Sequence, residues 1–158
     1  MRIVIVRHGQ AAAKKSWPGA DGERPLVARG ARQAERLGRI IGAPRPKRVI
    51  SSPALRCVQT VQPLADNCGL RVELSEQLST DAGPQAVALC RALLSSPAPH
   101  STIMLCTHRE VLNALLPQLA EEFGGKLGHR PPGAKGGAWI LRFRAGRLQK
   151  VEYHPPAA

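Results

Sequence analysis

Arg2-Ile3-Val4-Ile5-Val6-Arg7-His8-Gly9 is the stretch of this sequence that decides the fold. Its centre is a run of four β-branched residues, which is typical of a strand buried on both faces. Such strands belong to parallel sheets covered by helices, and open sheets of this kind bind ligands at the carboxyl ends of their strands. Arg7 and His8 therefore stand where a site is expected, although a capped strand with two solvated side chains explains the triplet equally well. Gly9 has no side chain, so another molecule or another stretch of backbone can approach it closely.

The composition indicates a globular domain with a strongly basic surface. The chain has 158 residues, 43% of them hydrophobic, so we expect a single domain over residues 1–158. Lysine and arginine number 23 against 11 acidic residues, and the net charge of +12 suits either nucleic acid or small anions such as phosphates. Only 3% of the residues are aromatic, and no zinc-finger, helix-turn-helix or basic-zipper pattern occurs. Nucleic acid is therefore not the expected partner, and part of the charge serves solubility.

A cytoplasmic location is expected, with no membrane association. No apolar run approaches the roughly 20 residues of a membrane helix. Arg7 and His8 interrupt the N-terminal apolar run after four residues, which is unlike a signal peptide. The four cysteines are widely spaced without a Cys-x-x-Cys pair, which argues against a zinc site and fits free thiols in a reducing compartment.

Periodicity and turn residues predict strands that alternate with helices, as in α/β proteins. Besides the first strand, strands are expected at 49–51, 70–74, 102–106, 138–143 and 148–153. Helices are expected at 30–41, from Ser52-Pro53 onwards, at 85–94 and after Glu110. Two polar segments, 10–29 and 126–137, are expected to be long loops that border a pocket. The predicted fold is a three-layer α/β/α arrangement with a mainly parallel central sheet.

Three of the predicted strands lead to polar side chains that can meet at one edge of the sheet. The first leads to Arg7 and His8, the strand 49–51 leads to a helix whose first turn carries Arg56, and the strand 102–106 leads to His108. A cation in the first turn opposes the helix dipole, which favours an anionic partner. Convergence brings two arginines, two histidines and a helix N-terminus together, and a phosphoryl group needs a site of this kind.

These motifs resemble those of the histidine phosphatase superfamily, also called the phosphoglycerate-mutase-like superfamily. Arg7-His8-Gly9 is similar to the defining triplet of the family. The family's Ser-Pro-x-x-Arg-x-x-Gln-Thr block is similar to residues 51–60, which read Ser-Ser-Pro-Ala-Leu-Arg-Cys-Val-Gln-Thr. The segment that carries the family's second histidine is similar to Thr107-His108. The resemblance covers nearly the whole chain and implies a phosphoglycerate-mutase-like fold. Within the family, the short chain resembles the small SixA-like branch, and most closely the histidine-phosphatase domain of mycobacterial MutT1-type proteins, without a Nudix block.

The resemblance implies a metal-independent phosphatase without a cofactor. It implies that His8 attacks phosphorus and becomes a phosphohistidine, which water then hydrolyses. Arg7 and Arg56 are expected to clamp the non-bridging oxygens, and His108 to donate a further hydrogen bond, with Gly9 beside the substrate. The expected substrate is a phosphohistidine protein or a small phosphate such as a nucleotide.

The proton donor is where this sequence departs from the family pattern. Many family members carry a glutamate after the third strand that protonates the leaving group. In this chain Glu76 and Asp81 are the candidates, and neither stands in a clear glutamate motif. Good leaving groups, as in a phosphoramidate or a phosphoanhydride, need less help from an acid. The alternative function is a binding module, in which a degenerate phosphatase fold holds phosphorylated ligands without turnover.

Overall fold

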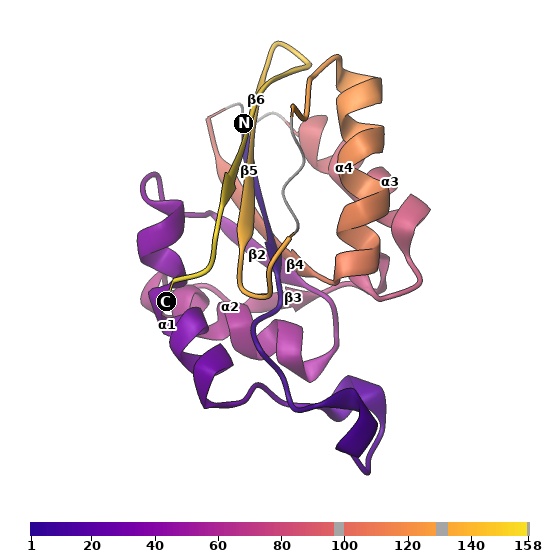
Figure 1. Ribbon diagram of the computed structural model, residues 1–158. Helices are drawn as coiled ribbons and strands as arrows, with labels where there is room; N and C mark the ends of the chain where they lie inside the picture. The colour runs from indigo at the N-terminus through magenta and orange to yellow at the C-terminus, as the bar shows by residue number, and fades with distance from the viewer. Residues whose placement is uncertain (97–99, 129–132, 158) are drawn as a thin grey trace.

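The computed structural model describes residues 1–96, 100–128 and 133–157, and it has a central sheet with helices on both faces (Figure 1). The strands are β1 (Arg2–Arg7), β2 (Arg48–Ser51), β3 (Val72–Leu74), β4 (Thr102–Thr107), β5 (Ala138–Arg144) and β6 (Arg147–His154). The α-helices are α1 (Ala28–Ile41), α2 (Leu55–Asn67), α3 (Gly83–Leu94) and α4 (Arg109–Phe123). Short 3-10 turns occur at η1 (Lys14–Ser16), η2 (Asp21–Glu23) and η3 (Glu76–Leu78).

The strands form one sheet in the order β3-β2-β4-β1-β5-β6. β1, β2, β3 and β4 run parallel, whereas β5 and β6 form an antiparallel hairpin that continues the sheet beyond β1. The predicted three-layer fold with a mainly parallel sheet is therefore confirmed. Within the described ranges, no helix combines the length and apolar character that a membrane crossing requires.

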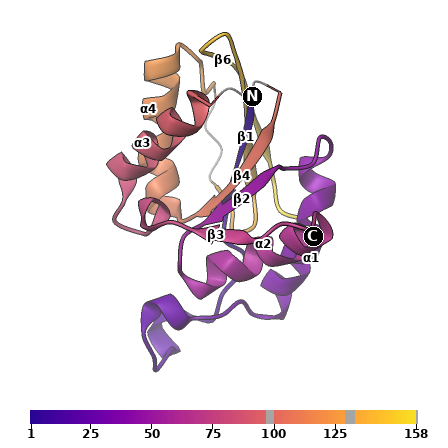
Figure 2. The same ribbon diagram turned by 180° about the vertical axis from the view of Figure 1, so that it is seen from behind.

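Both faces of β1 are buried, which explains its run of β-branched residues. Ile3 and Ile5 point into the apolar cluster beneath α3 and α4, and Val4 and Val6 point into the opposite cluster beneath α1 and α2. The two helix pairs lie on opposite sides of the sheet in both views (Figures 1 and 2). Each of these side chains is fully buried, which contributes about 1.5–3 kcal/mol per residue before entropic costs.

The register of the parallel strands brings their carboxyl ends to the same level. Arg7 of β1 pairs with Thr107 of β4, and Ser51 of β2 pairs with Cys106 of β4. The pairing continues one residue further, because the His8 amide donates to the Thr107 carbonyl at 3.1 Å. Three segments that are distant in sequence therefore leave the sheet together.

The segment between β1 and α1 extends beyond the strand ends and carries η1 and η2 (Figure 1). It is anchored at both ends, since Ala11 and Leu26 form an isolated antiparallel bridge and the Leu26 amide donates to Gln59 Oε1 at 2.8 Å. The start of α1 packs directly on the chain after β1, because a Cβ on Gly30 would lie 2.1 Å from the Gln10 carbonyl oxygen. The predicted loop 10–29 is thus an ordered arm rather than an open loop.

Several predicted boundaries differ from the structure, since α3 begins at Gly83 rather than at residue 85 and β3 begins at Val72 rather than at residue 70. α2 begins at Leu55 rather than at Ser52-Pro53, because the backbone of Ala54 is non-helical, and the Ser52 hydroxyl contacts His108 besides the Ala54 amide. α1 begins at Ala28, two residues before the predicted start. Of the predicted loop 126–137, residues 129–132 lie outside the described residues, and 133–137 pack over the end of β1.

Candidate active site

A cavity of about 560 Å³ opens where β1 and β4 end. Arg7, His8, Arg56 and His108 all line it, so the structure brings the four principal predicted site residues together. They come from the ends of β1 and β4 and from the first turn of α2. His8, Arg56 and His108 are each less than 10% exposed, so the floor of the cavity is formed by polar groups that are largely withdrawn from water.

One ring nitrogen of His8 is fixed and the other is left available. Nδ1 lies 2.9 Å from the carbonyl oxygen of Gly9. A carbonyl can only accept a hydrogen bond, so Nδ1 carries the proton and Nε2 of the neutral ring keeps its lone pair. Gly9 is held in turn, because its amide donates to Thr60 Oγ1 at 2.9 Å. A fixed tautomer with a free Nε2 is the state that nucleophilic attack requires.

The surroundings of His8 keep its ring neutral. Burial, together with the charge of Arg56, His108 and the charge of Arg7, lowers the pKa of His8 to about 3, against the opposing effect of the hydrogen bond to the Gly9 carbonyl. The His8 and His108 rings meet edge to face with centroids 5.5 Å apart. Proton loss is therefore no barrier to the use of His8 as a nucleophile near neutral pH.

We predict that His8 makes the protein less stable as the pH falls below about 6.5. In the unfolded chain His8 binds a proton near its ordinary pKa of 6.5, whereas in the folded chain it stays neutral until the pH approaches about 3. Between these values the unfolded state binds more protons, at up to about 1.4 kcal/mol per pH unit for one group. Chemical denaturation at pH 7 and pH 5 should show a smaller loss for His8→Gln than for the wild type, and equal losses would contradict the prediction.

Two of the arginines that line the cavity each have one donor without a partner. Arg7 Nε and Arg56 Nε are buried away from solvent, and neither meets an acceptor among the described residues. Arg7 Nη1 donates to the Gly133 carbonyl. Burial lowers the pKa of Arg7, and the charge of Arg109 adds to this effect. Two guanidinium groups in the wall of one cavity favour an anionic ligand with several oxygens.

Asp21 forms hydrogen bonds and an ion pair with Arg56, a contact that the sequence did not predict. The Asp21 carbonyl accepts from Arg56 Nη1 at 2.9 Å, and its Oδ2 accepts from Arg56 Nη2 at 3.1 Å. Burial raises the pKa of Asp21, but the charges of Arg56 and Arg24 outweigh it and the net pKa lies below the ordinary value. Its position in a polar stretch of the arm gave no sign of this contact, which depends on how the arm folds back over α2.

His108 is held by three neighbours. Its Nδ1 accepts from Arg56 Nη2 at 3.3 Å, and its Nε2 lies 2.8 Å from the Ser52 hydroxyl. The Cys57 sulfur is 3.7 Å from the same Nε2, and its pKa is lowered to about 6, because hydrogen bonds to Cys106 and His108 outweigh the opposing effect of burial. The Ser52 hydroxyl therefore orients the second histidine.

Three other predicted residues do not line this cavity. The missing side chain of Gly9 faces α1, where a Cβ would lie 3.1 Å from Gln33 Oε1 and 3.2 Å from Gly30 Cα, so its close neighbours belong to this helix. Glu76 and Asp81 are exposed, and the Glu76 carboxylate accepts from the Ser79 hydroxyl at 2.8 Å. Among the described lining residues, the carboxylates are those of Asp21 and Glu110.

The rest of the cavity wall is mainly cationic. Lys14 and Arg24 come from the arm, Arg109 from the start of α4 and Lys135 from the segment before β5. The sequence showed that the arm was basic, but it did not show that Lys135 and Arg109 would join it at one opening. Burial lowers the pKa of Lys135, and the charges of Arg7 and Arg24 lower it further.

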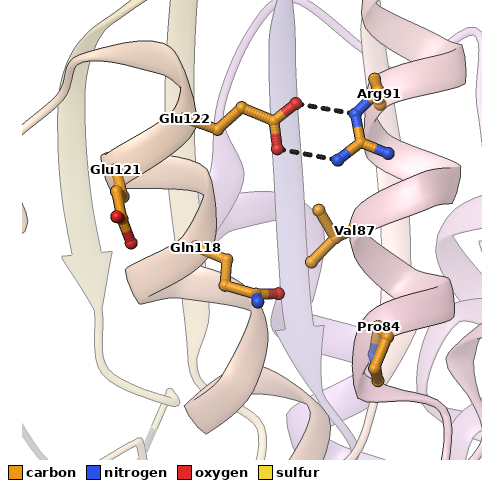
Figure 3. A pocket seen from close by; sticks show the side chains of 6 residues that line it. All are labelled: Pro84, Val87, Arg91, Gln118, Glu121 and Glu122. Atoms are coloured by element: carbon orange, nitrogen blue, oxygen red, sulfur yellow. Dashed lines mark hydrogen bonds and ion pairs between the residues drawn. The ribbon is translucent and has the colours of Figure 1, made fainter.

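A second hollow, of about 380 Å³, lies between α3 and α4 (Figure 3). Arg91 and Glu122 face each other across it and form two hydrogen bonds, at 2.7 and 2.9 Å. The described residues that line it include no histidine or cysteine, and its arginine is already neutralised. It therefore lacks the nucleophile and the open cations that distinguish the cavity at the strand ends.

Comparison with known proteins identifies the family. The model of the histidine phosphatase superfamily (branch 1) matches residues 3–84, which include Arg7, His8 and Arg56. A curated relative from Mycolicibacterium smegmatis (strain ATCC 700084 / mc(2)155), an 8-oxo-(d)GTP phosphatase, is 28% identical over 156 residues. The match covers 98% of this chain but 48% of the relative, so this chain spans about half the length of that protein.

Solved structures share the fold over almost their whole length. The protein histidine phosphatase SixA complexed with tungstate has a TM-score of 0.74 at 21% identity, over 98% of this chain and 97% of that one. A SixA protein from Agrobacterium tumefaciens, described as a phosphohistidine phosphatase, has a TM-score of 0.76 at 22% identity, over 98% of each chain. A mycobacterial glucosyl-3-phosphoglycerate phosphatase with bound VO3 has a TM-score of 0.75 at 17% identity, over 99% of each chain. The matched residues 3–84 are more than half of the sequence, and the chain therefore belongs to the histidine phosphatase superfamily, branch 1, a family of hydrolases that act on phosphate esters.

Proposed function

We propose that this protein is a metal-independent phosphatase that works through a phosphohistidine on His8. One observation carries the proposal: His8, whose Nδ1 is held by the Gly9 carbonyl, lines the same cavity as Arg7, Arg56 and His108. A nucleophile next to cationic donors is what phosphoryl transfer needs, because catalysis of this reaction consists mainly of positioning and charge stabilisation.

In the first step the lone pair of His8 Nε2 attacks phosphorus, and a P–N bond forms. The bond from phosphorus to the leaving group breaks, and the leaving group departs with the electron pair. Arg7 and Arg56 stabilise the charge on the non-bridging oxygens through paired hydrogen bonds. The Asp21 carbonyl and carboxylate accept from Arg56 Nη1 and Nη2, so a phosphoryl group at Arg56 competes with Asp21 for these donors.

In the second step water attacks the phosphohistidine. The new P–O bond forms as the P–N bond breaks, and the electron pair of the P–N bond returns to Nε2. The oxygen of water becomes the fourth oxygen of orthophosphate. One of its protons stays on that oxygen, and the other passes to another phosphate oxygen or to solvent. The Gly9 carbonyl holds Nδ1–H throughout, so the ring keeps one orientation for both steps. His108 supports the same oxygens once Arg56 turns to the ligand, because its Nδ1 is then free to carry a proton and donate it.

The substrate we propose is a phosphohistidine protein or a small phosphate such as a nucleotide. The two predicted acids, Glu76 and Asp81, lie outside the cavity lining. Of the two carboxylates that line it, Asp21 is bonded to Arg24 and Arg56 and has a lowered pKa, which makes it a poor proton donor, and Glu110 is the other. Leaving groups that depart with little acid assistance fit this arrangement best. A phosphoramidate and a phosphoanhydride both meet this condition. The two relatives described as acting on protein phosphohistidine and on 8-oxo-(d)GTP support these substrate classes.

The proposed chemistry needs no metal, because arginines supply the positive charge that a metal ion supplies in other phosphoryl-transfer enzymes. The cytoplasm is the proposed location, and the four free thiols support it because they suit a reducing compartment. Neither a membrane nor a nucleic acid is a proposed partner.

Trapping of the covalent intermediate distinguishes turnover from binding alone. We expect the protein mixed with p-nitrophenyl phosphate in excess EDTA to release nitrophenol and to carry a phosphoryl group on His8. The quench should be alkaline detergent, which preserves the P–N bond, and the label should be located by mass spectrometry. Turnover that chelator abolishes would overturn the metal-independent mechanism. Tight vanadate binding without turnover or phosphoenzyme would instead favour the phospho-ligand-binding module.

A further inference from the structure

The cavity carries more positive charge than one phosphoryl group neutralises. Its described lining has six cationic side chains and two carboxylates, which leaves a formal charge of +4 with neutral histidines. A phosphate ester brings a charge of about −1.5 to −2 at neutral pH. Roughly two positive charges therefore remain without a counter-charge when a single phosphoryl group lies beside His8.

The uncompensated cations lie towards the rim. Arg56 is 3% exposed on the floor, whereas Lys14 is exposed and Lys135 is half-buried at the mouth. Lys135 is affected by the charges of Arg7 and Arg24, and the described residues give it no anionic partner. Mutual repulsion of cations in a partly desolvated site costs free energy, so their retention around one opening points to a bound anion.

Some surface arginines have carboxylate partners, since Arg48 pairs with Glu73 at 2.7 Å and Arg91 pairs with Glu122 at 2.7 Å. What distinguishes the cations at the cavity mouth is that several of them surround one opening, next to Arg7 and Arg56.

Asp21 shows how closely the floor and the rim approach each other. One carboxylate spans both levels, with Oδ2 3.1 Å from Arg56 Nη2 on the floor and Oδ1 3.2 Å from Arg24 Nε at the rim. An anion bound at Arg56 therefore lies directly beside Arg24, and a second anionic group attached to it would extend from there towards Lys14 and Lys135, which line the same cavity.

We propose that Lys14, Arg24 and Lys135 form a second anion subsite, and that the preferred substrate is a phosphoanhydride whose terminal phosphate meets His8. The proposal rests on the proposed phosphatase function and selects among its substrates. The terminal phosphate is transferred to Nε2, the bond to the bridging oxygen breaks, and the departing phosphate keeps the electron pair while the rim cations stabilise its charge. This subsite also lessens the need for a general acid, because the leaving phosphate is already a weak base.

The test compares substrates that differ only in the second phosphate. We expect kcat/KM to be about tenfold or more higher for ADP than for AMP. Lys135→Gln and Lys14→Gln should each lower the ADP to AMP ratio by roughly three- to tenfold. Lys15→Gln is the matched control, because Lys15 is the exposed neighbour of Lys14 and does not line the cavity, and its ratio should equal that of the wild type.

The outcomes separate the subsite from the phosphatase function. Turnover of AMP or p-nitrophenyl phosphate with no preference for ADP, and with the same ratio in Lys135→Gln, would overturn the subsite and leave the phosphatase function intact. A preference for fructose 1,6-bisphosphate over fructose 6-phosphate, without one for ADP over AMP, would overturn the anhydride. If no substrate turns over, the phosphatase function fails, but calorimetry with pyrophosphate and orthophosphate still tests the subsite. Equal affinities for the two anions would overturn the subsite. Tighter binding of pyrophosphate that weakens in Lys135→Gln would support it.

Discussion

Replacement of His8 by alanine is expected to lower kcat/KM for p-nitrophenyl phosphate by roughly 10⁴-fold or more, on the scale on which loss of a covalent nucleophile acts in other enzymes. Nε2 is the atom that forms the P–N bond, and no other imidazole nitrogen in the described cavity has both a fixed tautomer and a free lone pair. The phosphoenzyme should disappear with the activity. Stopped-flow release of nitrophenol and mass spectrometry of the quenched protein measure the two effects.

The control for this variant is His154→Ala. His154 lies at the end of β6, where its Nε2 is 3.6 Å from Glu152 Oε2, and it does not line the cavity. Circular dichroism shows whether each variant is folded, and His8→Asn provides a second variant with a polar side chain in the same space. Turnover by a folded His8→Ala or His8→Asn protein within tenfold of the wild type would exclude the phosphohistidine mechanism.

Replacement of Arg56 by alanine is expected to lower kcat by about 10²–10³-fold, the usual effect of removing one preorganised donor to a transition-state oxyanion. Arg56→Lys should recover only part of this loss, because an ammonium group keeps the charge but cannot form the planar pair of hydrogen bonds. Vanadate inhibition should weaken in parallel, because vanadate occupies the same oxyanion contacts. The kcat and the vanadate inhibition constant of the two variants measure these effects.

We expect the Arg56→Ala protein to fold, and the structure offers a matched control variant. Asp21, the main partner of Arg56, has a side chain that is 45% exposed and can be solvated when the arginine is removed. The control is Arg48→Ala, since Arg48 also pairs with a carboxylate but lies at the start of β2 on the surface, where such pairs contribute about 0–1 kcal/mol. A folded Arg56→Ala protein with kcat within threefold of the Arg48→Ala protein would exclude Arg56 from the phosphate clamp.

Much of the fold follows from local patterns. The run Ile3–Val6 predicted a strand buried on both faces, and the apolar spacing after Gly30 and Glu110 predicted the helices α1 and α4, all of which the structure contains. Boundaries were less accurate where a side chain that usually caps a helix had another partner. Ser52 is the example, because its hydroxyl bonds His108, 56 positions away in the sequence.

The main site residues were also identified from sequence, because each stands directly after an apolar strand or in the first turn of a helix. Arg7, His8, Arg56 and His108 are brought into one cavity by the shared level of the strand ends. Glu76 and Asp81 were selected only by their position after the third strand. The position of an exposed carboxylate in the sequence does not specify whether its side chain turns towards a cavity. Glu76 and Asp81 lie outside the lining of the cavity at the strand ends.

The α/β fold and the arginine and histidine at the end of its first strand can be read from residues that are neighbours in the chain, because strand burial and strand-end chemistry are local properties, and the motifs around them resemble those of the histidine phosphatase superfamily. The bridge that Asp21 forms between Arg24 and Arg56, and the opening that Lys14 and Lys135 share, become visible only in the folded chain. The contact of Asp21 with Arg56 and the approach of Lys14 to Lys135 join segments more than 30 residues apart, and they depend on how the arm and the segment before β5 fold over the strand ends. No local pattern encodes that packing, and the charge balance around His8 depends on it.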